Sequence, residues 1–139
     1  MKTVGKDIYT LNTDGGARGN PGPAAAGIVI KNKNGKVIKS LGKYLEVCTN
    51  NDAEYQALIL GLETALNLGA KNLICIMDSE LVVKQLNGEY RIKIPRLRNF
   101  VNRIKNIEKD FDTIKYTHVL RGENKEADLI VNSILDSKA

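Results

Sequence analysis

The sequence predicts an α/β fold in which helices cover both faces of a five-stranded mixed sheet. Three segments with strand-like alternation come first, and Asn34-Gly35, a strong hairpin signal, joins the second to the third. Helical segments then alternate with two further strands. This order, βββαβααβα, indicates an antiparallel meander followed by parallel strands reached through helical crossovers. We expect one domain over residues 1–139, because this length suits a single core.

The first half of the chain predicts three strands and a helix. The strands are expected at residues 7–13, 24–31 and 37–45. Directly after Asp14, residues 15–23 contain four glycines and two prolines, which predicts a loop made largely of backbone. The next segment, TNNDAEYQALILGLETALNLG, begins with N-cap side chains from Thr49 onward, continues with apolar residues at helical spacing and stops at Gly69.

The second half predicts two strands and three helices. A continuous apolar run at residues 73–77 is typical of a strand covered on both faces. A short helix is expected at residues 80–86, and a longer one from about Pro95. Its apolar stripe consists of Phe100, Ile104, Ile107 and Phe111. A fifth strand at residues 114–120 and a last helix at residues 124–137 complete the pattern.

Composition limits the class of protein. Hydrophobic residues make up 42% and charged residues 27% of the chain, which are globular values. No apolar run approaches the roughly 20 residues that a membrane span needs, so we expect no membrane partner. Cys48 and Cys75 are isolated thiols without the spacing of a zinc site, which favours a reduced, cytoplasmic setting.

Basic residues gather in one stretch. The chain has a net charge of +5, and residues 84–105 carry seven basic side chains against one acidic side chain, Glu89. A basic surface on a near-neutral body favours a polyanionic partner. The alternative is an ordinary solvated helix face, and charge alone does not separate the two.

Four acidic residues occupy positions where α/β proteins often place their sites. Asp14 ends the first expected strand, and Asp78 follows the buried one. Glu54 and Asp128 lie in the first turns of the first and last helices. Each also has a structural explanation, because helix N-termini attract acids through the helix dipole and strand ends often carry Asp. A shared site requires the four to converge, which spacing cannot show.

Four motifs contain these acids: TDGGARGNPGPAAAG, TNNDAEYQALILGL, MDSELVVKQL and NKEAD. In this order and at these separations they resemble the type 1 ribonucleases H, which cut the RNA strand of an RNA–DNA hybrid. The resemblance covers residues 7–135. It implies the ribonuclease H-like fold, in the compact form without a basic protrusion or a hybrid-binding domain.

The resemblance implies that Asp14, Glu54, Asp78 and Asp128 are catalytic metal ligands. Phosphodiester hydrolysis needs an activated water and a stabilised leaving oxygen, and two divalent ions about 3.5–4 Å apart supply both. We expect two Mg²⁺ ions with substrate bound, and Mn²⁺ as an alternative, because hard cations prefer oxygen ligands. Clustered carboxylates are costly as scaffold, since two like charges about 4 Å apart repel by ~4 kcal/mol at an effective dielectric of about 20.

The resemblance also implies substrate contacts. A glycine loop can bring backbone against a sugar–phosphate chain. Asn50 and Asn51 resemble readers of the minor groove, where a 2′-hydroxyl distinguishes RNA from DNA. Thr49 resembles a residue that binds a DNA phosphate. Helix capping is the alternative for Thr49, Asn50, Asn51 and Ser79. The expected contacts are Gly15, Gly16, Ala17, Arg18, Asn20, Thr49, Asn50, Asn51, Ser79, Gln85 and Arg121.

Three features depart from the family pattern. The span LRGENKEAD is short and lacks the loop histidine of many members, so we expect Arg121, or Glu123 as an auxiliary, to assist the metal site. His118, the only histidine, alternates within the expected fifth strand and is expected to be structural. Ile94 stands about where relatives often have an Asn for a DNA phosphate, and no basic hairpin is present. Residues 91–105 then supply any non-specific grip.

These observations predict a metal-dependent endoribonuclease acting as a monomer on RNA–DNA hybrids, with 5′-phosphate and 3′-hydroxyl products. Two alternatives stay open. One is a non-catalytic nucleic-acid-binding module on the same fold. The other is a different nuclease of that fold, such as a junction resolvase or a structure-selective ribonuclease. Acids at all four motif positions argue against an inactive module.

Overall fold

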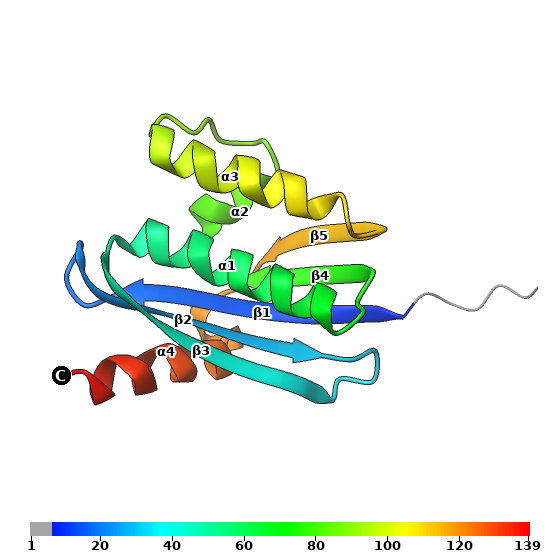
Figure 1. Ribbon diagram of the computed structural model, residues 1–139, viewed down its shortest axis with the longest axis horizontal. Helices are drawn as coiled ribbons and strands as arrows, with labels where there is room; N and C mark the ends of the chain where they lie inside the picture. The colour runs from blue at the N-terminus through cyan, green and yellow to red at the C-terminus, as the bar shows by residue number, and fades with distance from the viewer. Residues whose placement is uncertain (1–6) are drawn as a thin grey trace, which may run out of the picture.

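A computed structural model describes residues 7–139 and confirms the expected fold class and element order (Figure 1). The described residues form one five-stranded sheet in the order β3-β2-β1-β4-β5. β1 pairs antiparallel with β2 and parallel with β4, so the meander and the crossovers are both present. The strands are β1 (Ile8–Ala17), β2 (Gly22–Lys31), β3 (Val37–Cys48), β4 (Asn72–Met77) and β5 (Thr113–His118).

Helices cover both faces of this sheet. Figure 1 shows α1, α2 and α3 on one side and α4 on the other. The larger core lies under α1–α3 and includes Tyr55, Leu62 and Met77, whereas α4 covers a smaller core around Ala25 and Val131. The helices are α1 (Asn50–Asn67), α2 (Glu80–Leu86), α3 (Pro95–Glu108), the 3₁₀ turn η1 (Arg121–Glu123) and α4 (Lys125–Ser137). Within residues 7–139, no helix has the length and apolar character required to span a membrane.

The first strand is longer than the sequence predicted. Its parallel pairing with β4 stops at Thr13 opposite Met77, but its antiparallel pairing with β2 continues to Ala17 opposite Ala24. The expected strand end at residue 13 was therefore wrong. The small residues after Asp14 stay in the ladder because β2, which begins at Gly22, offers small residues opposite them. Asp14 consequently lies where β1 runs beyond the end of its neighbour.

The C-terminal ends of three other elements also differ from the sequence prediction. β3 extends to Cys48, because its backbone stays paired with β2 up to Gly22. α3 ends at Glu108, so Phe111 is buried from the turn after the helix rather than from its apolar stripe. β5 ends at His118, leaving Val119 and Leu120 outside the strand.

Gly15 allows α1 to pack directly against β1. A Cβ atom at Gly15 would lie 2.2 Å from the carbonyl carbon and oxygen of Ala53, closer than real Cβ contacts permit. At the neighbouring Gly16, a Cβ atom would meet its nearest atom, on Val131, at 3.7 Å, an ordinary contact. Of these two consecutive glycines, the packing requires Gly15 and tolerates replacement of Gly16.

We expect Gly15→Ala to destabilise the protein and Gly16→Ala to leave its stability nearly unchanged. An added methyl group at Gly15 must push α1 away from β1, and overpacking of this kind costs about 1–3 kcal/mol or more. Denaturant unfolding of both variants and the wild type measures the difference. Equal stability of the two variants would contradict this account of the packing.

Candidate metal centre

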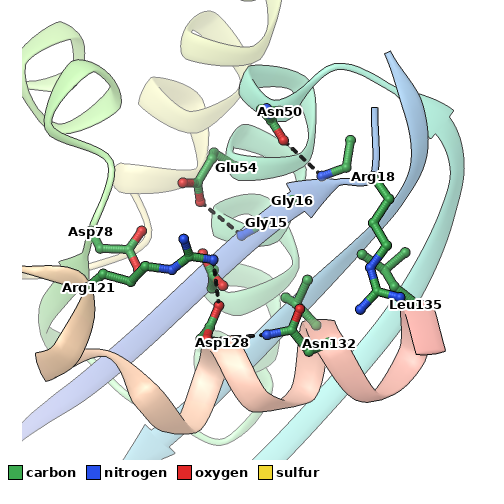
Figure 2. A pocket seen from close by; sticks show the side chains of 13 residues that line it. Gly15, Gly16, Arg18, Asn50, Glu54, Asp78, Arg121, Asp128, Asn132 and Leu135 are labelled. Atoms are coloured by element: carbon green, nitrogen blue, oxygen red, sulfur yellow. Dashed lines mark hydrogen bonds and ion pairs between the residues drawn. The ribbon is translucent and has the colours of Figure 1, made fainter. Parts of the chain in front are cut away.

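A cavity of about 520 Å³ opens where β1 runs past β4 (Figure 2). β1 and the residue after it contribute one wall, and the first turns of α1 and the length of α4 contribute others. Its lining residues are Asp14, Gly15, Gly16, Ala17, Arg18, Asn50, Glu54, Asp78, Arg121, Asp128, Val131, Asn132 and Leu135. The cavity therefore holds all four acids that the sequence analysis selected.

Three of these acids form a compact group. One carboxylate oxygen each from Asp14, Glu54 and Asp78 lies within 4.8 Å of the others. Asp14 and Glu54 are only 7% and 8% exposed, and Asp78 is half-buried. Figure 2 shows that Glu54 and Asp78 approach from different elements, α1 and the end of β4.

Packing at Gly15 brings Glu54 to this group. Because α1 contacts the β1 backbone there, the Glu54 side chain reaches the strand, and its Oε1 accepts a hydrogen bond of 2.9 Å from the Gly15 N–H. Glu54 lies in the first turns of α1 on its buried side, beside Tyr55 and Ala53. Its neighbour in sequence, Asp52, instead closes the capping box with Thr49 and accepts from Arg96 at 2.8 Å.

The group is electrostatically strained. Burial, together with the charge of Asp78 and the hydrogen bond and charge of Asp128, raises the pKa of Asp14 to about 8. Burial also raises the pKa of Glu54 well above its usual range, with the Asp14 charge as a second cause. Burial raises the pKa of Asp78, although the hydrogen bond from Asn124 and the charge of Arg121 oppose this. Without a cation, the ionised form of each of these carboxyls is therefore disfavoured.

A divalent cation fits this donor set. Mg²⁺ and similar hard ions take carboxylate oxygens as ligands, and their charge relieves the mutual repulsion that raises the pKa values here. No histidine or cysteine lines the cavity, so the soft or nitrogen ligands typical of zinc are absent from this part of the described chain. Asp14, Glu54 and Asp78 are the residues that could hold such an ion.

Asp128 lines the same cavity but is not one of the three acids whose carboxylate oxygens lie within 4.8 Å of one another. It lies in the first turn of α4, where Oδ1 accepts from Arg121 at 3.3 Å and Oδ2 accepts from Asn132 at 3.3 Å. The side chain of Arg121 is 79% exposed, and its charge acts on Asp14 and Asp78 as well as on Asp128. Arg121 is thus an exposed counter-charge beside the acids.

The residues after Asp14 are tied to the start of α1. The Ala17 N–H donates to Asn50 Oδ1, and the Asn50 N–H donates to Asn20 Oδ1, both at 2.9 Å. Arg18 points along the cavity to the end of α4, where its Nη2 lies 2.6 Å from Asp136 Oδ1 (Figure 2). Gly15, Gly16, Ala17, Arg18 and Asn50 therefore line the cavity, whereas Asn20 supports it from outside.

Four other expected substrate contacts do not line the cavity. Thr49 and Ser79 act as N-caps of α1 and α2, the alternative that the sequence analysis left open. Gln85 is buried and accepts a hydrogen bond from the Tyr55 hydroxyl, so the structure places it in the core. Asn51 is half-buried in the first turn of α1.

The residues near the expected catalytic loop also differ from the prediction. His118 was expected to be a structural residue within the fifth strand, but it is exposed as the last residue of β5. The strand ends there, and a positive charge on His118 would oppose, without reversing, the rise in the pKa of Asp78. Glu123 is exposed in η1 and does not line the cavity.

Sequence reasoning missed two buried amides beside the acids. Asn124, the N-cap residue of α4, is 1% exposed and contacts both Asn12 and Asp78 through its side chain. Asn12 precedes Asp14 by two positions on β1 and is also buried. In the sequence, Asn124 opens both the NKEAD motif and the expected last helix, and a position at a helix start predicts capping rather than a contact with Asp78.

The basic stretch is partly neutralised within the protein. Lys84, Arg96, Arg103 and Lys105 each form an ion pair, with Glu80, Asp52, Glu63 and Glu108 respectively. Arg91, Lys93 and Arg98 are exposed and make no ion pair within residues 7–139. The Arg96–Asp52 pair joins the start of α3 to the start of α1. Arg91, Lys93 and Arg98 lie within a few residues of Arg96 in the sequence and therefore flank this junction.

We expect Asp14→Asn to be more stable than the wild type in EDTA, by an amount that grows with pH. The raised pKa of Asp14 means that the folded wild type loses stability as pH rises from about 4, the usual carboxyl value, to about 8. The Asn variant lacks this loss, so its melting temperature at pH 8 should exceed that of the wild type by about 3 °C or more.

Asp52→Asn is the control, because Asp52 is paired with Arg96 and caps α1 rather than sharing the crowded group. That variant should melt below the wild type at every pH. A pH-independent difference between wild type and Asp14→Asn would show that repulsion at Asp14 does not limit stability.

Comparisons with known proteins agree with this geometry. Residues 12–134 match the model of the reverse transcriptase-like family. The crystal structure of ribonuclease H1 from the archaeon Halobacterium salinarum superposes with a TM-score of 0.91 at 39% identity, covering 94% of this chain and 98% of that one. The ribonuclease H1 known as LC11, solved with an RNA/DNA hybrid, gives 0.88 at 38% identity, covering 94% and 98%.

A curated relative extends well beyond the matched region. A bifunctional protein of Mycobacterium tuberculosis is 38% identical over 130 residues, which are 93% of this chain but 36% of the relative. The chain thus spans about a third of that protein's length. The match to the family model and the similarity to solved ribonuclease H1 chains agree with the four motifs and with the sheet order. The chain therefore belongs to the reverse transcriptase-like family and, within it, to the type 1 ribonucleases H.

Proposed function

We propose that this chain is an endoribonuclease that hydrolyses the RNA strand of RNA–DNA hybrids with the help of divalent metal ions. The observation that carries the proposal is the convergence of carboxylate oxygens from Asp14, Glu54 and Asp78 within 4.8 Å at one end of an open cavity. The hybrid is the proposed substrate because the LC11 structure, which this chain resembles over most of its length, was solved with one.

The metal site would be held by Asp14, Glu54 and Asp78, with Asp128 on its border. Bound ions, for which we propose Mg²⁺, would supply an activated water and charge stabilisation for the leaving oxygen, giving 5′-phosphate and 3′-hydroxyl ends. The protein's own part is to fix the carboxylates before substrate binds: the Gly15 N–H holds Glu54, and Asn132 holds Asp128. Such preorganisation avoids reorganisation during the reaction.

Substrate would follow the wall formed by residues 14–18 and the start of α1. Gly15 and Gly16 line the cavity there, Gly16 is partly exposed whereas Gly15 is buried, and Asn50 is exposed at the rim. Arg121 reaches over the acids with its guanidinium in solvent, a position suited to a phosphate oxygen. Exposed cations at Arg91, Lys93 and Arg98 would add non-specific attraction to the backbone.

We expect Asp78→Asn to abolish hybrid cleavage while preserving hybrid binding in Ca²⁺. The substitution removes a metal ligand but leaves the cavity wall unchanged. A labelled-hybrid cleavage assay with Mg²⁺, run beside duplex DNA, duplex RNA and a four-way junction, tests activity and substrate class together. Residual cleavage above a few per cent would remove Asp78 from the metal site, and cleavage of the junction alone would replace the ribonuclease assignment.

Neutralising the exposed cations should weaken binding without changing maximal rate. In the triple variant Arg91→Gln, Lys93→Gln and Arg98→Gln, we expect a higher KM and a flatter salt dependence. Each lost phosphate contact should reduce the log–log salt slope by about 0.9 or less. The control replaces Lys36, Lys39 and Lys109 by Gln, since these exposed residues lie at the β2–β3 turn, at the start of β3 and at the end of α3. If both triple variants changed KM and the salt dependence equally, the attraction to the hybrid would depend on net charge and not on the position of these three cations.

A further inference from the structure

Asn124 is a buried amide whose hydrogen-bonding groups are all directed at the elements that carry the acids. Its side chain is almost completely enclosed, at 1% exposure. Nδ2 donates to the backbone oxygen of Thr13 at 2.8 Å and to Asp78 Oδ2 at 3.4 Å. Oδ1 accepts from Asn12 Nδ2 at 3.0 Å. Both donors and the acceptor are thus used, which fixes the orientation of the amide.

The backbone of Asn124 extends this connection to the remaining site residues. Its N–H donates to the Arg121 oxygen at 3.0 Å, and its carbonyl accepts from the Asp128 N–H at 3.2 Å. One residue therefore links β1 immediately before Asp14, the carboxylate of Asp78, the turn that carries Arg121 and the first turn of α4. The residues of β1 that Asn124 contacts lie more than 100 positions before it in the chain.

Helix capping does not explain this arrangement. Asn124 occupies the N-cap position of α4, but its side chain makes no capping hydrogen bond to that helix. A capping Asn would direct Oδ1 at the backbone N–H groups of the first turn. Here Oδ1 is turned away from the helix and toward Asn12 of β1. The side chain is used to connect α4 to the sheet at the site.

The contact with Asp78 matters because a single side chain supports that carboxylate. Glu54 is held by the Gly15 N–H, and Asp128 by Arg121 and Asn132. For Asp78, the hydrogen bond from Asn124 is the only side-chain hydrogen bond that the described residues provide. At 3.4 Å it is also the longest hydrogen bond of the Asn124 amide. It restrains one oxygen of Asp78, and Asp78 still lines the cavity.

We propose that Asn124 is a positioning residue, which sets the Asp78 carboxylate and the start of α4 for metal binding. This inference rests on the proposed metal-dependent function. Groups that hold a ligand in place typically contribute 10–100-fold to metal affinity. Asn124 would act at the lower end of this range, because Asp14 and Glu54 also supply ligands and Asn124 makes no hydrogen bond to either carboxylate.

The experiment measures metal binding without turnover. Melting temperatures of the wild type and Asn124→Ala are recorded in EDTA and then across a Ca²⁺ titration. We expect the concentration for half-maximal stabilisation to rise by about tenfold in Asn124→Ala. In cleavage assays, the variant should lose kcat at low Mg²⁺ and recover it at high Mg²⁺, with the KM for hybrid unchanged.

Asn72→Ala is the matched control. Asn72 is also a buried amide, it accepts one side-chain hydrogen bond from Thr113 at 2.9 Å, and it lies at the opposite end of β4 from Asp78. This variant should lose stability in EDTA, but its Ca²⁺ titration should overlay that of the wild type. If Asn124→Ala does not fold, the test uses Asn12→Ala, which removes the hydrogen-bond donor to Asn124 Oδ1. A rise in the Ca²⁺ concentration for half-maximal stabilisation of that variant supports the proposal.

Two outcomes would overturn different claims. If the wild type is stabilised by Ca²⁺ and the Asn124→Ala or Asn12→Ala titration overlays it, Asn124 has no positioning role. If Ca²⁺ does not stabilise even the wild type, the proposed metal site itself fails. The two failures are distinguishable because the first requires a normal wild-type titration.

Discussion

The close contact between Gly15 and the first turn of α1 is the constraint on which the site depends. It exists because position 15 has no side chain, so the helix backbone can lie against the strand backbone. Glu54 then extends over β1 to the Gly15 N–H and reaches Asp14 on the same strand. A larger residue at position 15 would separate the two elements and therefore the two carboxylates.

The termination of β4 completes the geometry. Because β4 stops opposite Thr13 while β1 continues along β2, Asp14 has no neighbouring strand on one side, and Asp78 leaves β4 at that gap. α4 closes the other side of the gap and brings Asp128, and Asn124 joins this helix to both strands. The site is therefore assembled from both faces of the sheet, which is why acids from four distant segments can meet.

The electrostatic cost of this assembly indicates its use. Burial raises the pKa values of Asp14, Glu54 and Asp78, so the folded protein keeps acids where they are least stable as carboxylates. Arg121 offsets part of this cost from an exposed position. Strongly perturbed acids in an open cavity are typical of functional sites, and a cation resolves the repulsion that the fold itself leaves uncompensated.

The sequence by itself determined the fold class, the order of elements and the identity of the four acids. Periodicity, the Asn34-Gly35 hairpin and the capping residues are local signals, because they depend on neighbours within a few positions. The family resemblance added the expected chemistry. These parts could be predicted because each depends on residue types at fixed separations along the chain.

Only the tertiary structure decided which acids share the closest group, how far β1 extends and what Gln85, His118 and Asn124 contact. β1 passes residue 13 because β2 pairs with it, and Gln85 is buried because Tyr55 of α1 lies beside it. His118 is exposed because β5 ends there, and Asn124 is a contact rather than a cap because Asn12 of β1 faces it. Each outcome depends on a partner from a distant segment, and no local pattern specifies the distance between two segments that meet only after folding.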